Sequence, residues 1–195
     1  MTTSVRMLST ALRALLALTV ILGLAYPALI VGIGRIVPRE ADGSLIYDGE
    51  TVIGSSLIGQ DFSSDLSLFQ SRPSAAGDNG YDPTSSGASN LAPTNEELAA
   101  NIASAKEEIA QRDGVDPAQI PADALTASAS GLDPHISPAY AELQIARVAE
   151  RNNMSESDIR ALVSAHTETP ALGFVGQPRV NVLELNLALL KARGE

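Results

Sequence analysis

The stretch ALLALTVILGLAYPALIVGIG, residues 14–34, contains no charged side chain over 21 positions. At about 1.5 Å per residue, a helix of this length spans a hydrocarbon core of about 30 Å. A signal peptide has an apolar region of only about 7–15 residues before a small-residue cleavage site. The longer run therefore predicts an uncleaved transmembrane helix over residues 14–36, preceded by a short N-terminal segment, residues 1–13.

Pro27 lies inside this apolar stretch and predicts a bend in the helix. Proline has no backbone N–H, so one helical hydrogen bond is left unmade. Neighbouring helices help to satisfy the freed carbonyl in a membrane, and Gly23, Gly32 and Gly34 are positions where another helix can come close. Glycine and proline are also common in membrane helices generally, so a partner helix is one of two interpretations.

Charge is distributed unevenly along the chain. Four arginines precede the first acidic residue, Glu40: Arg6, Arg13, Arg35 and Arg39. Residues 40–195 contain the nine remaining Lys and Arg and all 23 Asp and Glu, so this region carries a formal charge of −14. Basic residues flank the apolar stretch almost equally, and the positive-inside rule alone leaves its orientation open. The acidic body favours a cytoplasmic N-terminus with residues 40–195 outside.

The composition excludes several classes of function. An acidic domain repels nucleic acid, which excludes binding to a phosphate backbone. Without cysteine there are no disulfides, thiolate metal sites or cysteine nucleophiles. Tryptophan is absent and aromatic residues make up only 4%, which disfavours a stacking platform for bases or sugars. Negative charge keeps a domain soluble, and it also concentrates cations weakly.

Residues 40–195 are predicted to form a single α+β domain that begins with short strands. Two apolar runs, residues 45–47 and 51–53, are bounded by the turn dipeptides Asp42-Gly43 and Asp48-Gly49. Residues 70–93 are dense in Ser, Gly, Pro, Asp and Asn and predict a long irregular loop. A loop of this length in a compact domain is usually either functional or disordered.

Three or four helices are expected after this loop. Thr94 followed by Glu97 forms a capping box, which marks the start of the first helix. Apolar residues then recur at helical spacing to about residue 112, and Gly114 ends the helix. Residues 126–132 are expected to be extended or irregular. Candidate N-caps open the later helices: Ser137, ahead of Pro138; Ser155 or Ser157; and Asn181.

Asp133 and His135, two residues apart, are the first candidates for chemistry in this body. These residue types suit a shared metal ion or a catalytic pair, but no third metal ligand lies nearby in the sequence. The alternative is a turn in which both side chains bond to backbone groups ahead of a helix. Ser128 and Ser130 would complete a serine hydrolase, yet the Gly-x-Ser-x-Gly motif and the glycine-rich nucleotide motifs are missing. We therefore assign neither a catalytic residue nor a metal ligand.

Six short segments stand out along the chain: Tyr26-Pro27; GSSLIGQ, 54–60; RPSA, 72–75; SGASNL, 86–91; TASASGLDPHIS, 126–137; and RVNVLELN, 179–186. Together, and in this order, they resemble the C subunit of the Kdp family of potassium transporters, and the resemblance extends over nearly the whole chain. It implies a single-pass protein of the bacterial inner membrane, with a cytoplasmic N-terminus and an extracytoplasmic domain of residues 40–195.

The resemblance also implies an ATP-driven potassium-uptake complex in the lipid bilayer. In that family a channel-like subunit selects potassium, a P-type ATPase subunit hydrolyses ATP, and a small single-helix subunit joins them. This chain lacks the Asp-Lys-Thr-Gly-Thr signature of the phosphorylation site, so it is expected to be an accessory subunit that stabilises the assembly. Potassium and ATP are then handled by the complex, and the chain needs no cofactor of its own.

Individual residues receive expected roles from the same resemblance. Three are expected at the interface with the channel subunit: Asn90, Asp133 and His135. Three match positions proposed to contact nucleotide and so to raise the ATP affinity of the ATPase subunit: Ser130, Gly131 and Gln144. The alternative function is a stand-alone sensor or hydrolase tethered to the membrane, in which the extracytoplasmic domain would act alone.

Overall fold

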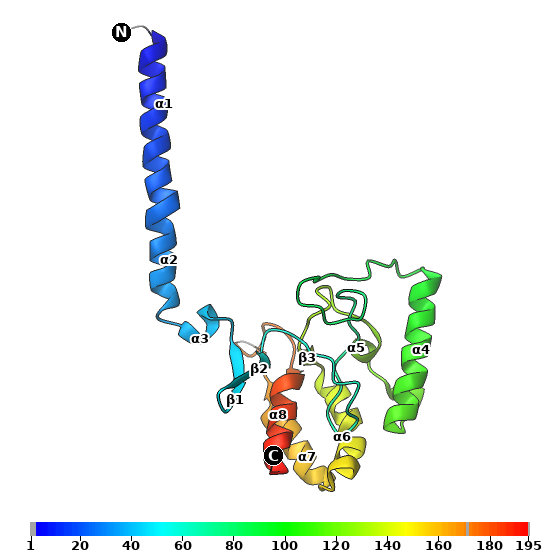
Figure 1. Cartoon of the computed structure of the whole chain (residues 1–195). Helices are drawn as coiled ribbons and strands as arrows, with labels where there is room; N and C mark the ends of the chain where they lie inside the picture. The colour runs from blue at the N-terminus through cyan, green and yellow to red at the C-terminus, as the bar shows by residue number, and fades with distance from the viewer. Residues whose placement is uncertain (1–2, 171, 195) are drawn as a thin grey trace. The chain divides into compact units, whose positions relative to one another are not determined.

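The computed structural model describes residues 3–170 and 172–194, which fall into two units, Met1–Leu45 and Ile46–Glu195. The first unit is dominated by one long helix, in which α1 (Thr3–Val20) continues through the π-helical turn η1 (Ile21–Ala25) into α2 (Tyr26–Gly34) (Figure 1). No residue of this long helix is buried by the rest of the chain, and the helix is long and apolar enough to cross a membrane. The expected apolar helix is confirmed, although it begins well before the uncharged stretch.

The π-helical turn ends at Ala25, two residues before Pro27. The backbone N–H of Tyr26 donates to the carbonyl of Ile21, five residues earlier, instead of to the residue four earlier. Because Pro27 has no N–H for the carbonyl of Gly23, the regular hydrogen-bond pattern must change near this point. The change therefore falls where the sequence predicts a bend. A short helix, α3 (Pro38–Ala41), follows the long one.

Short strands open the second unit where the apolar runs predict them. β1 (Leu45–Asp48) and β2 (Thr51–Ser55) pair as a two-stranded sheet, and Gly49 turns the chain between them with a φ of +59°. Residues 56–95 then contain no helix or strand, so the expected irregular loop is confirmed and is longer than its composition suggests.

Side-chain amides hold this long loop against the helices. Asn186 accepts a hydrogen bond from the N–H of Phe69 at 2.8 Å and donates to its carbonyl at 2.9 Å. Gln144 makes the same pair of bonds with the backbone of Gln70, at 2.7 and 3.2 Å. Each side-chain amide makes the hydrogen bonds that a neighbouring strand would make, because it pairs with both the N–H and the carbonyl of one loop residue. Phe69 is thereby held fully buried in the core.

Four helices of the second unit form where the spacing predicts them: α4 (Glu96–Asp113), α6 (Pro138–Asn152), α7 (Glu156–Ala165) and α8 (Val182–Ala192). The 3-10 turn η2 (Pro117–Gln119) and the short helix α5 (Ala122–Leu125) lie between α4 and α6, where no helix was predicted. Ser137 and Asn181 are the N-caps of α6 and α8, as expected, and Ser155 caps α7, for which the sequence left Ser155 and Ser157 as alternatives. The predicted cap of α4 is wrong by one residue, because Asn95 accepts from the N–H groups of Glu97 and Leu98.

A three-stranded sheet, which the sequence did not indicate, joins α6 to α8. Its antiparallel strands lie in the order β3 (His135–Ile136), β5 (Arg179–Asn181) and β4 (Thr167–Glu168). In Figure 1, α7 packs against both α6 and α8. The core lies between these helices, the sheet and the long loop, and its largest fully buried side chains include Tyr140, Ile145, Ile159, Leu185 and Leu189.

Candidate functional site

The central loop, residues 126–134 between α5 and β3, is the point where the short motifs of this sequence meet. Its backbone carbonyls accept hydrogen bonds from four other segments. The bonds are Gly87 N to Ser130 O (2.9 Å), Ser74 Oγ to Gly131 O (2.6 Å), Gly59 N to Leu132 O (2.8 Å) and Val182 N to Pro134 O (3.0 Å). Motifs that are far apart in the sequence therefore surround one loop.

Gly131 shows how closely these backbones approach one another. Its φ is +69°, in the left-handed region that glycine occupies without a Cβ clash. A Cβ at this position would lie 2.7 Å from both the amide nitrogen of Ala76 and the carbonyl oxygen of Gly87. Packing of the central loop therefore requires glycine here, whatever ligand or partner the loop meets.

Asp133 ties the central loop to two basic side chains. Its Oδ2 lies 3.0 Å from Nη1 of Arg72, and its Oδ1 accepts from the N–H of His135 and lies 3.0 Å from the Nδ1 of that ring. Arg72 also donates from Nε and Nη2 to the carbonyl of Thr126, at 3.3 and 3.1 Å. Asp133 thus forms the turn before β3 that the sequence allowed, and it gains Arg72, 61 residues away, as a partner.

The surroundings of Asp133 favour its ionised form. Burial acts to raise the pKa of this carboxyl, but the hydrogen bonds from His135 and the charges of His135 and Arg72 outweigh burial and lower the pKa. A carboxylate with a lowered pKa stabilises the fold above its unfolded pKa, about 4, and this contribution is lost as the pH falls through the folded value.

Arg72→Met is expected to lower the free energy of unfolding by about 1–2 kcal/mol, because Asp133 and the Thr126 carbonyl lose a charged donor. Unfolding should also depend less on pH in acid, since the carboxylate loses one cause of its lowered pKa. Urea denaturation of the full chain in detergent, near neutral pH and near pH ~3, measures both effects. The control is Arg160→Met, because the Arg160 side chain is half exposed and its ion pairs should contribute less than about 1 kcal/mol.

The residues expected to contact nucleotide lie in two different environments. Ser130 is in the central loop, where its hydroxyl accepts from the N–H of Leu132 and lies 3.3 Å from the hydroxyl of Ser128. Gln144 lies on α6 and is fully buried. Its amide bonds to the backbone of Gln70 and accepts from Nη2 of Arg147 at 2.8 Å. Within the described chain, Gln144 therefore shares no hydrogen bond with the central loop.

The residues expected at an interface are accessible to different degrees. Asn90 is exposed in the long loop with a φ of +52°, and its amide donates to the carbonyl of Ala88. The side chains of Asp133 and His135 keep 30% and 22% of their surface exposed. Both line a cavity of about 540 Å³ together with Arg72 and Arg179, so a partner group can reach them.

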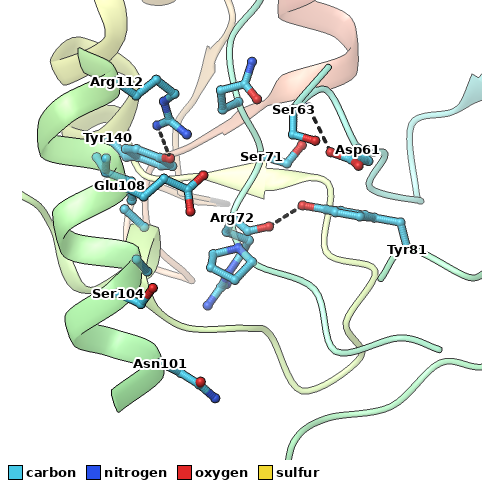
Figure 2. Close-up of a pocket in the computed structure, with 15 residues that line it drawn as sticks. Asp61, Ser63, Ser71, Arg72, Tyr81, Asn101, Ser104, Glu108, Arg112 and Tyr140 are labelled. Atoms are coloured by element: carbon cyan, nitrogen blue, oxygen red, sulfur yellow. Dashed lines mark hydrogen bonds between the residues drawn. The ribbon is translucent and has the colours of Figure 1, made fainter. Parts of the chain in front are cut away.

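A second cavity, of about 340 Å³, lies between α4 and the loop that carries Arg72 (Figure 2). Figure 2 shows Glu108 extending from α4 toward that loop, below the pair of Arg112 and Tyr140, whose hydroxyl accepts from Arg112 at 2.9 Å. The Tyr81 hydroxyl donates to the carbonyl of Arg72, and burial raises the pKa of Tyr81 to about 12. Much of the remaining wall is polar: Asp61, Ser63, Ser71, Asn101 and Ser104.

A buried ionic network extends from Arg112, which lines this cavity, and it was not predicted from the sequence. The Asp113 side chain has no exposed surface and lies between Arg112 Nη2, at 2.7 Å, and Arg147 Nε, at 2.5 Å. Arg147 also donates to the carbonyls of Leu66 and Leu68, which belong to the long loop. The one available signal was a charged residue within the apolar face of α6. The network fixes the loop to two helices.

Among residues 3–170 and 172–194, no three His, Asp or Glu side chains are grouped in a way that could hold a metal ion. The side chains of Asp133, Ser130 and Gln144 are already hydrogen-bonded to other groups of the protein. The arrangement is therefore suited to presenting a rigid polar surface to a partner.

Comparison with known proteins gives a consistent result. A family model described as KdpC, the c chain of K+-transporting ATPase, matches residues 8–191. The potassium-transporting ATPase KdpC subunit of Kineococcus radiotolerans is 51% identical over 193 residues, which are 98% of this chain and 97% of that protein. The KdpC subunit of Geobacter metallireducens is 50% identical, over 92% of this chain and 94% of that protein. The subunit of Xanthomonas campestris pv. campestris is 51% identical, over 88% and 80%.

Proposed function

Because this chain belongs to the KdpC family, the c chains of K+-transporting ATPases, we propose that it is an accessory, non-hydrolysing subunit that stabilises a potassium-uptake complex. Its proposed partners are a channel-like subunit that selects potassium, a P-type ATPase subunit and a small single-helix subunit. Potassium and ATP are handled by these partners, and this chain contributes contacts and needs no cofactor.

The long apolar helix is the main observation that supports this proposal. Its side chains are not buried by the chain itself, so they need lipid or other helices around them. The π-helical turn that ends two residues before Pro27 makes the backbone irregular, and packing against neighbouring helices helps to satisfy the polar groups that this irregularity frees. We place residues 14–36 across the inner membrane, residues 1–13 in the cytoplasm and residues 40–195 outside it.

We propose the surface around the central loop as the docking site for the channel-like subunit. The loop is held by hydrogen bonds from four segments, so its conformation is established before any partner binds. A preorganised surface loses little conformational entropy on binding. Asn90, Asp133 and His135 are the side chains on or beside this surface that we assign to the contact.

A pull-down of the full chain through a C-terminal tag, after mild solubilisation, tests the proposal. We expect a multi-span subunit and an ATPase subunit to accompany the wild-type chain. Asn90→Arg is expected to weaken this association by about 1–2 kcal/mol, or about 5- to 30-fold, as charge enters a docked surface.

Asn153→Arg is the matched control for this substitution. Asn153 is also exposed and also has a φ of +52°, so the same residue change brings the same charge and backbone strain at the end of α6. An equal loss in both variants would argue against docking at Asn90. Recovery of the wild-type chain folded but without partners would argue for the stand-alone sensor or hydrolase instead.

We further propose that the chain raises the ATP affinity of the ATPase subunit through assembly, without touching nucleotide. The buried amide of Gln144 is occupied by Gln70 and Arg147, which supports an indirect route. The KM for ATP of purified complexes distinguishes the two routes. A raised KM in a Ser130→Ala complex that retains all subunits would indicate direct contact at the central loop.

A further inference from the structure

An apolar tip, formed by Leu172, Phe174 and Val175, lies in the connection between β4 and β5. The exposed fractions of Leu172 and Phe174 are 85% and 79%, the highest among the large apolar side chains described in the second unit. The other phenylalanines of the chain are used differently, since Phe69 is fully buried and Phe62 packs against the core. Clustered apolar side chains with such exposure mark an interaction site.

The connection presents its apolar side chains away from the domain. β4 and β5 pair at its base, where Arg179 contacts Glu168 at 2.8 Å through both Nε and Nη2. A Cβ at Gly173 or Gly176 would find no atom within 4 Å, so neither glycine is packed against the domain. The N–H of Gly173 donates to the carbonyl of Pro170, which closes a turn at the tip.

We propose that the apolar tip inserts into the interfacial region of the lipid bilayer that the chain's own helix spans. This inference rests on the membrane placement under the proposed function. Residues 35–44 connect α2 to β1 and reach at most about 36 Å when fully extended. The tether therefore keeps the tip at a high effective concentration near one bilayer surface.

The apolar tip is uncharged, which distinguishes it from the acidic remainder of the domain and allows it to approach lipid. Residues 40–195 have a formal charge of −14, which an anionic bilayer repels. Residues 169–178 contain no charged side chain, and the ion pair of Glu168 and Arg179 neutralises their base. Phenylalanine and leucine bind well at the boundary between headgroups and acyl chains. The tip thus meets the bilayer without bringing the acidic surface into it.

The chain contains no cysteine, so single cysteines report on single positions. The full chain carrying Phe174→Cys, labelled with an environment-sensitive dye, is placed in nanodiscs of phosphatidylethanolamine and phosphatidylglycerol. Lipids brominated near the top of the acyl chain are expected to quench this dye at least about twofold. Ala161→Cys, exposed on α7, should be unaffected, and Ile30→Cys, within the span, should be quenched by deeply brominated lipids.

The outcomes separate the inference from its premise. Quenching at position 30 but not at 174 would overturn the insertion of the tip and leave the membrane helix intact. Loss of quenching at position 30 as well would overturn the membrane placement and the tip together. A dye at 174 that is shielded from water only in the assembled complex, and is not quenched by brominated lipid, would assign the tip to a groove of a partner subunit.

A second variant tests the apolar character of the tip. With the dye at Val175→Cys, adding Phe174→Ser is expected to reduce the lipid quenching by at least half. Unchanged quenching would mean that the domain lies on the bilayer for another reason, and it would overturn the role assigned to the tip.

Discussion

Asp113→Ala is expected to lower the free energy of unfolding by about 3–5 kcal/mol, among the largest effects of any single substitution in the domain. The Asp113 side chain has no exposed surface, and Arg147 retains only 5% of its own. Removing the carboxylate leaves the Arg147 guanidinium buried with only carbonyl and amide acceptors around it. A buried charge without its counter-charge is far more costly than a broken surface ion pair.

Urea denaturation of the full chain in detergent, followed by far-UV circular dichroism, measures this loss. Glu142→Ala is the control, because the Glu142 side chain is 52% exposed and pairs with Arg160 at 2.8 Å. Its loss should cost less than about 1 kcal/mol. A double change, Asp113→Leu with Arg147→Met, should recover most of the stability by removing both charges. Equal costs for Asp113→Ala and Glu142→Ala would contradict the buried network.

Gly131→Ala is expected to cost about 2–5 kcal/mol for two separate reasons. The left-handed backbone costs a residue with a Cβ about 1–2 kcal/mol. The new methyl would also lie 2.7 Å from the backbone of Ala76 and of Gly87, and overpacking of this kind costs about 1–3 kcal/mol more. Because both contacts involve backbone atoms, rotation of a side chain cannot relieve them.

Gly114→Ala separates the two reasons. Gly114 ends α4 with a φ of +66°, nearly that of Gly131, yet a Cβ there meets nothing within 4 Å. It should therefore cost only about 1–2 kcal/mol, the contribution of the left-handed conformation itself. The difference between the two variants, measured by the same denaturation, is the contribution of the close approach. If the two losses were equal, the central loop would not be packed as tightly as the structure shows.

Sequence patterns predicted well the features that depend on neighbouring residues. Ser137 and Asn181 were identified as caps, and the cap of α7 was narrowed to Ser155 or Ser157, because a cap bonds to groups only two or three residues away. The one error, Thr94 for Asn95, arose because two good capping residues are adjacent and only the backbone geometry distinguishes them. Strands of two or three residues, such as β3 and β4, are too short to show an alternating pattern.

The candidate site was predicted in parts. A turn at Asp133 was one of the alternatives that the sequence left open, and the Asp133 carboxylate does accept from the N–H of His135, two residues on. Their partner Arg72 was known only as part of a motif, since no local pattern relates it to Asp133. Gln144 was matched to a nucleotide contact, whereas its buried bonds to Gln70 become visible only after α6 packs against the long loop.

Hydropathy and charge, read along the chain alone, establish the apolar helix and the acidic α+β body, because transfer of a segment into lipid depends on its own composition. The arrangement of the body required the tertiary structure. Asn186 holds Phe69 across 117 positions, Arg147 reaches Asp113 across 34, and four segments close on the central loop. Such contacts are chosen by complementary shape and by the cost of leaving buried polar groups unpaired, and both arise only when distant segments pack together.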